Sequence, residues 1–192
     1  MTRASFRFVT LFTAIGLCCA LSPAFAQNAQ TAAQADVGLG FKGIGGSIGF
    51  VDPENVSSAV DLGFHIDAGP LVRNVHLIPS LNYWNVGADV GAYHADVKDF
   101  AISTDVNVDF PLQGGRFTPY LGGGLGLNFL SFDSNAPNGV SSNETKLGLN
   151  VLGGMRNDVM PNLAIFGELR YSFVTDANQL KILGGFTYKF IY

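Results

Sequence analysis

Residues 184–192 read GGFTYKFIY and place an aromatic ring at every second position up to the end of the sequence. The rings belong to Phe186, Tyr188, Phe190 and Tyr192. Terminal residues usually have little to pack against, so rings at these positions need a surface that holds them. Strict alternation is the period of a β-strand, whose successive side chains point to opposite faces. The stretch therefore predicts a strand with one aromatic face.

The other end of the sequence has the pattern of a secretory signal peptide. The first seven residues carry two arginines and no acid, and the apolar run FVTLFTAIGLCCAL and a small-residue site follow. This run is too short for a spanning helix, which needs about 20 apolar residues. We expect export by the Sec pathway and cleavage after Ala26. The expected divisions are a signal peptide at 1–26, a short N-terminal segment at 27–36 and one domain at 37–192.

Composition limits the class of protein further. Both cysteines, Cys18 and Cys19, lie in the signal peptide, so the exported chain has no disulfide. The formal charge of −4 becomes −6 once the two arginines of residues 1–26 are removed. A chain this acidic is not expected to bind nucleic acid, which requires clustered Lys and Arg. Charged residues make up only 14% of the chain, against about 25% in soluble domains.

The apolar residues are distributed by twos along the chain. VDLGFHIDA at 60–68, for example, sets five apolar side chains against Asp61, His65 and Asp67. This alternation predicts half-buried strands. In the first strand the apolar parity changes, which predicts a β-bulge near Gly43. Eight strands are expected, at residues 38–51, 60–68, 75–83, 100–110, 117–129, 146–155, 163–173 and 182–192.

The connections alternate between two kinds. The short ones are 69–74, 111–115 and 156–162, and the longer, more polar ones are 52–59, 85–98, 133–144 and 175–179. Hydrocarbon offers backbone groups no hydrogen-bond partner, so a sheet that crosses a bilayer must close on itself. An even number of alternating strands with short turns at one end is the pattern of such sheets. The sequence therefore predicts an all-β, eight-stranded, antiparallel up-and-down transmembrane β-barrel.

Residues 37–192 resemble the small eight-stranded bacterial outer-membrane proteins, the OmpA-barrel-like, opacity-type and OmpW-like group. The resemblance rests on the signal peptide, the strand count, FGELRYSF at 166–173 and the terminal GGFTYKFIY. It implies a monomer in the outer membrane that contacts lipid and lipopolysaccharide. It also implies passage through periplasmic chaperones and the barrel-assembly machinery, which reads the terminal aromatic strand. Phe is the usual last residue in that group, and this chain has Tyr192 instead.

Charged residues on the inner parity are candidates for a network that closes the lumen. An eight-stranded barrel is about wide enough for its side chains to fill it, and unpaired charges inside are costly. The expected levels are Asp61 and Asp99 with Lys146 and Lys181 near the longer loops, Asp105 and Glu168 with Arg170 at mid-height, and Asp67 and Asp109 with Arg156 and Lys189 near the short turns. The alternative is a water-filled bore in which these charges are solvated.

The sequence indicates no enzyme, metal or cofactor. His65 shares a face with two aspartates without a known ligand spacing, so we interpret it as a lumen histidine bonded to a carboxylate. His76 and Ser80 share a face but lie about 13 Å apart along a strand, too far for a nucleophile and its base. The glycine runs at 43–49 and 121–126 lack the phosphate-loop spacing and are expected to make room for lumen side chains.

The expected role is structural, or a surface interaction through the loops at 85–98 and 133–144. Two alternatives stay open. The first is a narrow OmpW-like channel for small apolar solutes. The second is a soluble exported lipid-binding barrel, which would place its apolar residues inside and its polar faces outside.

Overall fold

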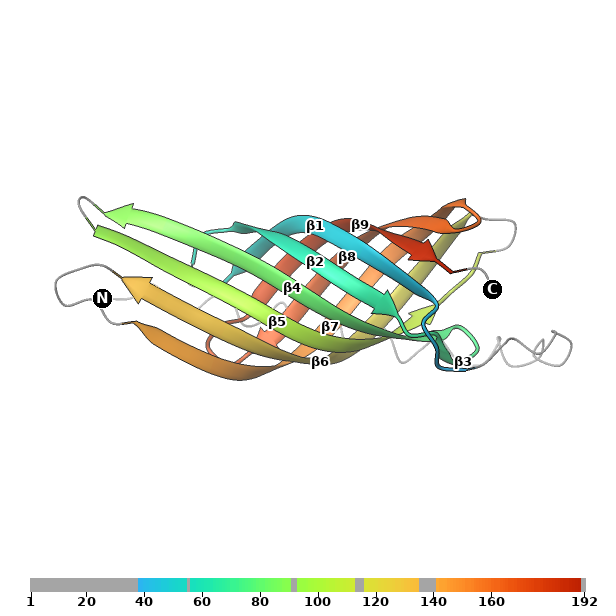
Figure 1. The fold of residues 1–192 in the computed structure, drawn as a ribbon, viewed down its shortest axis with the longest axis horizontal. Coiled ribbons are helices and arrows are strands. Elements are labelled where there is room, and N and C mark those ends of the chain that lie inside the picture. The colour runs from blue at the N-terminus through green and yellow to red at the C-terminus, as the bar shows by residue number, and fades with distance from the viewer. Residues whose placement is uncertain (1–37, 55, 91–92, 113–115, 135–140, 191–192) are drawn as a thin grey trace, which may run out of the picture. The chain divides into compact units, whose positions relative to one another are not determined.

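The computed structural model describes residues 38–54, 56–90, 93–112, 116–134 and 141–190. These residues form one antiparallel sheet of nine strands (Figure 1). The strands are β1 (Gly43–Pro53), β2 (Ala59–Asp67), β3 (Pro70–Val72), β4 (Val75–Val90), β5 (Tyr93–Asp109), β6 (Phe117–Ser134), β7 (Ser142–Met160), β8 (Leu163–Val174) and β9 (Gln179–Lys189). Among them, no helix is long and apolar enough to cross a membrane.

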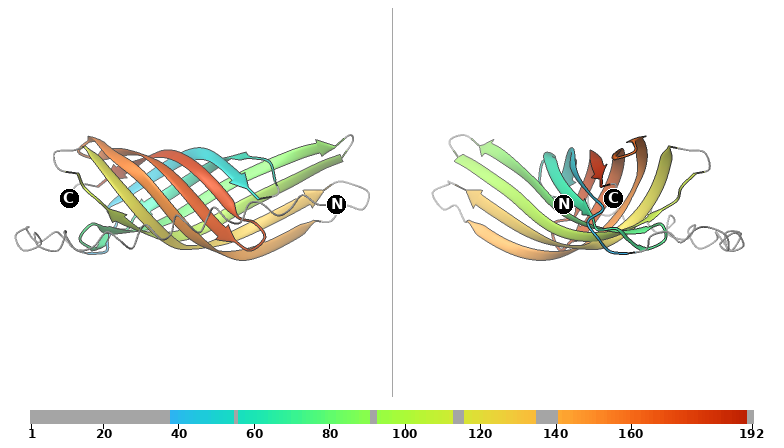
Figure 2. Two further views of the ribbon diagram at one scale, coloured as in Figure 1. Left: turned by 180° about the vertical axis from the view of Figure 1, so that it is seen from behind. Right: turned by 45° about the vertical axis from the view of Figure 1, so that its right-hand side comes forward.

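The sheet is closed. The strand order is β2-β1-β9-β8-β7-β6-β5-β4-β3, and β2 also pairs with β4 to complete the ring. The three-residue strand β3 pairs only with β4 and is part of the connection between β2 and β4. Eight long strands therefore make the wall, wound around a common axis (Figures 1 and 2). The predicted eight-stranded antiparallel barrel is confirmed.

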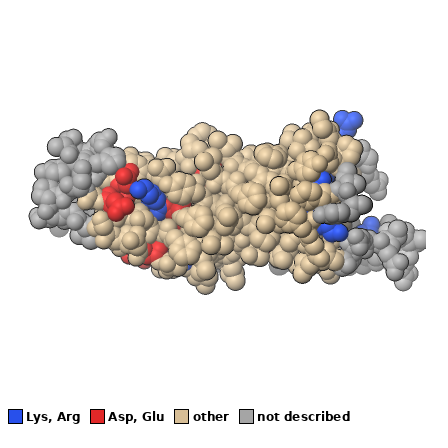
Figure 3. Space-filling view, viewed as in Figure 1, with Lys and Arg blue, Asp and Glu red and all other residues tan. Residues whose placement is uncertain are grey.

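The side chains alternate as a bilayer requires. On the outside, Phe64 is 44% exposed and Leu125 is 58% exposed, whereas the inward Asp105 is fully buried. On the face shown in Figure 3, charged side chains gather toward the two ends and the middle carries almost none. This arrangement is the reverse of what a soluble lipid-binding barrel needs, so that alternative is wrong.

Two expected boundaries are also wrong. The first strand has no bulge near Gly43, because β1 begins there and pairs without a break with both β2 and β9. Most of the expected loop 85–98 is strand, because β4 and β5 pair up to Val90 and Tyr93. The expected loop 133–144 is strand at both of its ends, since β6 runs to Ser134 and β7 begins at Ser142. Their polar composition suggested loops because a strand beyond the apolar band no longer needs an apolar outer face.

The wall has two heights. Strands β4 to β7 contain 16, 17, 18 and 19 residues, whereas β1, β2, β8 and β9 contain 11, 9, 12 and 11. The extra length projects at the end where β4 meets β5 and β6 meets β7, here called the loop end (Figure 1). The opposite end is called the turn end. The part of β4–β7 that rises above the short strands is the tall wall.

Glycines on β6 leave space for the side chains of β5. A Cβ atom on Gly124 would collide with the Asp105 carboxylate and the Thr104 carbonyl, and one on Gly126 would lie 2.7 Å from the Ser103 hydroxyl. The interpretation that the glycines of residues 121–126 make room for lumen side chains is confirmed at these positions. The glycines thus position the polar groups that fill the barrel.

Candidate functional site

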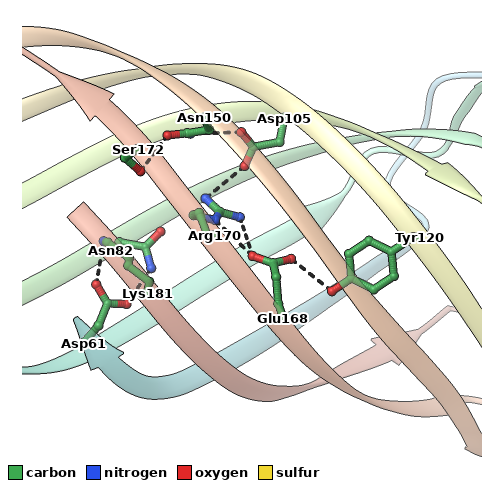
Figure 4. A network of polar contacts seen from close by, with 9 residues as sticks. All are labelled: Asp61, Asn82, Asp105, Tyr120, Asn150, Glu168, Arg170, Ser172 and Lys181. Carbon is green, nitrogen blue, oxygen red and sulfur yellow. Dashed lines mark hydrogen bonds and ion pairs between the residues drawn. The ribbon is translucent and has the colours of Figure 1, made fainter. Parts of the chain in front are cut away.

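Arg170 on β8 is the centre of a buried polar network at mid-height (Figure 4). Its Nη1 atom lies 3.0 Å from Oδ2 of Asp105 on β5, and its Nε and Nη2 atoms each lie 2.9 Å from Oε1 of Glu168. The Tyr120 hydroxyl donates a hydrogen bond of 3.0 Å to Oε2 of the same glutamate. One guanidinium thus links a carboxylate of its own strand, β8, to a carboxylate of β5.

The same network continues through neutral groups on β7 and returns to β8, the strand that carries Arg170. The Asn150 amide donates to Oδ1 of Asp105 at 3.0 Å, and its own oxygen accepts a hydrogen bond of 2.8 Å from Ser172 (Figure 4). Both oxygens of Asp105 therefore have partners. Satisfied buried networks hold their members in one arrangement, which suits a plug.

A second buried layer contains an ion pair between β9 and β2. Nζ of Lys181 lies 2.7 Å from Oδ2 of Asp61, and the Asn82 amide donates to the other oxygen at 2.8 Å. Both charged side chains are almost completely buried. Every oxygen of this carboxylate is thus engaged by a donor from a neighbouring part of the wall.

A third layer involves two residues that sequence reasoning missed. The Gln179 amide donates to Oδ2 of Asp99 at 2.6 Å, and its oxygen accepts a hydrogen bond of 3.3 Å from the Trp84 indole. Gln179 was expected in a loop but begins β9 and is buried. Trp84 shares the inner parity of Ser80 and Asn82, and that parity was the signal that could have found it.

The turn end has its own cluster. Arg156 forms an ion pair with Asp109, while Nδ1 of His76 lies 3.2 Å from Asp67 and its Nε2 lies 3.8 Å from Asp109. His65 differs from expectation, because its Nε2 contacts the Thr187 hydroxyl at 2.9 Å and not a carboxylate. His76 is therefore the histidine that meets the aspartates.

Two of the expected lysines lie outside the buried layers. Lys146 pairs at 3.0 Å with Glu144 of its own strand, because it sits above Gly148, where β7 gains β8 as a neighbour. Lys189 ends β9 at the rim of the turn end and pairs at 2.5 Å with the exposed Asp158. Neither lysine pairs with the acids that were expected at its level across the lumen. Both lie near the end of a strand, where an acid on the rim of the barrel is the nearer partner.

His76 and Ser80 do not form a hydrogen-bonded nucleophile–base pair. The His76 ring is engaged by two carboxylates, whereas the Ser80 hydroxyl is buried without a hydrogen-bond partner. No group of three or more possible metal ligands occurs within the described ranges. Charged and amide side chains instead occupy the interior of the barrel and form hydrogen bonds and ion pairs with one another.

Two cavities flank these layers and share no lining residue. The lower one, of about 50 Å³, lies toward the turn end and is lined by Asn107, Arg156 and Arg170 among others. The upper one, of about 540 Å³, lies at the loop end above Trp84 and Gln179. The polar layers separate the two spaces.

The terminal strand has its rings outside. Phe186 and Tyr188 are exposed on the outer face, and Phe190 stacks on Phe41 with the ring centroids 5.1 Å apart. Tyr192 and the predicted signal peptide lie outside the described residues. The exposed rings fit the aromatic girdle that flanks the apolar band of such barrels.

A closed antiparallel barrel with an apolar belt outside and paired polar groups inside defines a transmembrane β-barrel protein. Residues 11–190 match the family model of the outer membrane protein beta-barrel domain, so the chain belongs to this family. Its location is accordingly the outer membrane. No curated protein matches the chain.

Solved structures share the fold. Neisserial surface protein A is 24% identical with a TM-score of 0.64, over 80% of this chain and 99% of that one. A major outer membrane protein from Thermus thermophilus is 15% identical, with a TM-score of 0.59 over 77% and 98% of the two chains. Ail, the attachment invasion locus protein of Yersinia pestis, is 17% identical with a TM-score of 0.51 over 77% and 95% in its complex with the heparin analogue sucrose octasulfate.

Proposed function

We propose that the protein is a closed, non-catalytic outer-membrane barrel whose lumen does not conduct and whose loop end serves surface interaction. The observation that carries this proposal is the stack of buried polar layers around Arg170, Lys181 and Gln179. Each layer joins strands from different parts of the wall. A solute would have to separate these groups in order to pass.

The energetics favour a plug that stays shut. Breaking a buried ion pair by withdrawing one partner typically costs about 3–5 kcal/mol, because the remaining charge is left without compensation. Arg170 engages two carboxylates at once, so a passing ion would have to replace both contacts. The same layers argue against a conduit for small apolar solutes, which cannot replace any of them.

The surface role is supported by the tall wall and by the relatives. Strands β4–β7 project beyond the others and carry charged side chains, which a surface in contact with lipid would not carry. One example is the ion pair between Lys98 and Asp133, at 3.9 Å. Two proteins of the same fold are named as a surface protein and as an attachment protein. We expect contact with lipopolysaccharide around this end, and assembly as a monomer.

Conductance in planar bilayers tests the closed lumen. The wild-type protein should stay near the baseline, while Arg170→Gln should produce intermittent openings, because Asp105 and Glu168 then repel each other across a wetted gap. Lys98→Gln, which removes an ion pair on the outside of the tall wall, is the matched control and should stay closed. Stable wild-type channels that are undiminished by Asp105→Asn or Arg170→Gln would overturn the proposal.

A further inference from the structure

The upper cavity is bounded by the tall wall on one side and by the β1–β2 and β8–β9 connections on the other. Residues of β4–β7 supply most of its lining, and Pro53, Val56 and Ala177 belong to the β1–β2 and β8–β9 sides. Its volume of about 540 Å³ is that of a small-molecule pocket, for which about 300–1,000 Å³ is usual. Its floor is closed, because Trp84 and Gln179 are buried and hydrogen-bonded to each other.

On β4, β5 and β6 the inner face of the tall wall is apolar, which reverses the pattern of the barrel below it. Strand β7 instead contributes Ser142, Glu144 and Lys146 to that face. Val86 pairs with Val97 and Val97 pairs with Phe132, so these three side chains form one row across β4, β5 and β6. Leu130 and Ala95 line the same cavity. On the outer face, the neighbouring row carries Lys98, which pairs in register with Ser131.

This inversion begins at a row of outward aromatic side chains. Tyr83, Phe100 and Phe129 lie opposite one another on β4, β5 and β6, and the two phenylalanine rings are 6.2 Å apart. Aromatic girdles mark the membrane–water interface of such barrels. Above that row the outside is polar because it meets water, and the apolar inner face has no lipid to contact. Phe132 remains 41% exposed although it lines a concave surface.

The rim of the cavity is acidic. Three carboxylates line it, from Glu54, Glu144 and Asp176, against the single ammonium of Lys146. Lys146 already pairs with Glu144 at 3.0 Å, and Glu54 accepts a hydrogen bond of 2.8 Å from Asn178. Two negative charges, those of Glu54 and Asp176, are thus left without a cation among the lining residues.

We propose that this cavity is a binding site for a small organic cation, a molecule with an apolar body and a protonated amine. The apolar body would lie against Val97 and Phe132 above the Trp84 indole, and the amine would point to the rim carboxylates. Aromatic faces add attraction for a cation that enters such a pocket. This site gives the proposed surface role a class of ligand. It rests on that role in one respect only, that the ligand enters from the loop end.

The chain carries its own reporter of occupancy. Trp84 is the only tryptophan of the protein and lies at the floor of the cavity. A heavy-atom probe bound above it should quench its fluorescence. The probe we choose is 4-bromophenethylammonium, added to the full-length exported chain in bilayer nanodiscs of zwitterionic lipid. Two isosteres isolate the charge: neutral 4-bromophenethyl alcohol and anionic 3-(4-bromophenyl)propanoate.

The cation should quench Trp84 saturably and bind about tenfold more tightly than the neutral isostere. The anion should bind more weakly still. Both differences follow from the charges of Glu54 and Asp176, which would lie within a few ångströms of the charged group of the probe. Phe132→Ser should weaken all three probes. Glu54→Gln together with Asp176→Asn should remove only the preference for the cation. Asp133→Asn, on the outer face of the tall wall, is the matched control and should change nothing.

Quenching that rises linearly without saturation, or that is unchanged in Phe132→Ser, would overturn the proposal, as would equal affinity for cation and anion. These outcomes are distinct from a failure of the closed lumen. A protein that conducts in planar bilayers but still shows saturable, charge-selective quenching refutes the plug and supports the site. A protein that does not conduct and shows no saturable quenching supports the plug and refutes the site.

Discussion

Lys181 and Asp61 lie 120 residues apart in the sequence and 2.7 Å apart in the barrel, where both are buried. One belongs to β9 and the other to β2, and β1 runs between these two strands. The ion pair therefore spans the seam at which the first and last parts of the chain close the ring. It couples closure of the sheet to the filling of its interior.

Lys181→Met should destabilise the folded barrel by about 3–5 kcal/mol, because it leaves the Asp61 carboxylate buried without its cation. The double variant Asp61→Leu with Lys181→Met should recover much of this loss, since it removes both charges. Urea unfolding from lipid vesicles, followed by the heat-dependent gel shift, measures both. Losses that simply add in the double variant would contradict a direct pair.

Gly124→Ala should cost about 1–3 kcal/mol of stability, because its new methyl group collides with Asp105 and with the backbone of the neighbouring strand. Gly167→Ala is the matched control on β8, where an added Cβ meets nothing within 4 Å. The same unfolding assay compares them. Equal stability of the two variants would show that β6 does not need its glycines to accommodate β5.

Leu125→Arg should cost about 2–4 kcal/mol, because it places a charge on the exposed apolar face of the barrel in the middle of the bilayer. Asn143→Arg places the same side chain at an exposed position of β7 in the tall wall, above the aromatic row, and should be nearly neutral. Folding yield in vesicles of increasing thickness adds a second measurement. A neutral Leu125→Arg variant would mean that this face does not contact lipid.

Exchanging Phe186 and Tyr188 for serine should slow insertion into the outer membrane, because the resemblance to small outer-membrane barrels implies that these rings belong to an assembly signal. Tyr171→Ser, at another outward ring on β8, is the control and should insert at the normal rate. Pulse-chase labelling with the heat-dependent gel shift follows insertion in cells. The signal is located elsewhere if both proteins insert alike.

The fold was predictable because alternation is a local property. Each strand declares its two faces within about ten residues, and a bilayer leaves a closed sheet as the only arrangement for such strands. The alternation alone therefore predicts that Asp105 lies inside the barrel and Leu125 outside.

The partners inside the barrel were less accessible to sequence reasoning. They depend on the stagger between strands, which alternation does not specify. Lys146 was expected to face Asp61 and Asp99 but pairs within its own strand, and Asp99 is held by Gln179 instead. Polar stretches near 85–98 were interpreted as loops because the point at which strands leave the apolar band is invisible in composition alone.

The unequal strand lengths give the molecule a front and a back within the plane of the membrane. A molecule that diffuses along the cell surface meets the tall wall when it approaches from β4–β7. It meets only the short strands when it approaches from β1 and β9. Access to the upper cavity is therefore easier from the side of the short strands. Rotation of the barrel about its axis decides which neighbouring molecule faces that side.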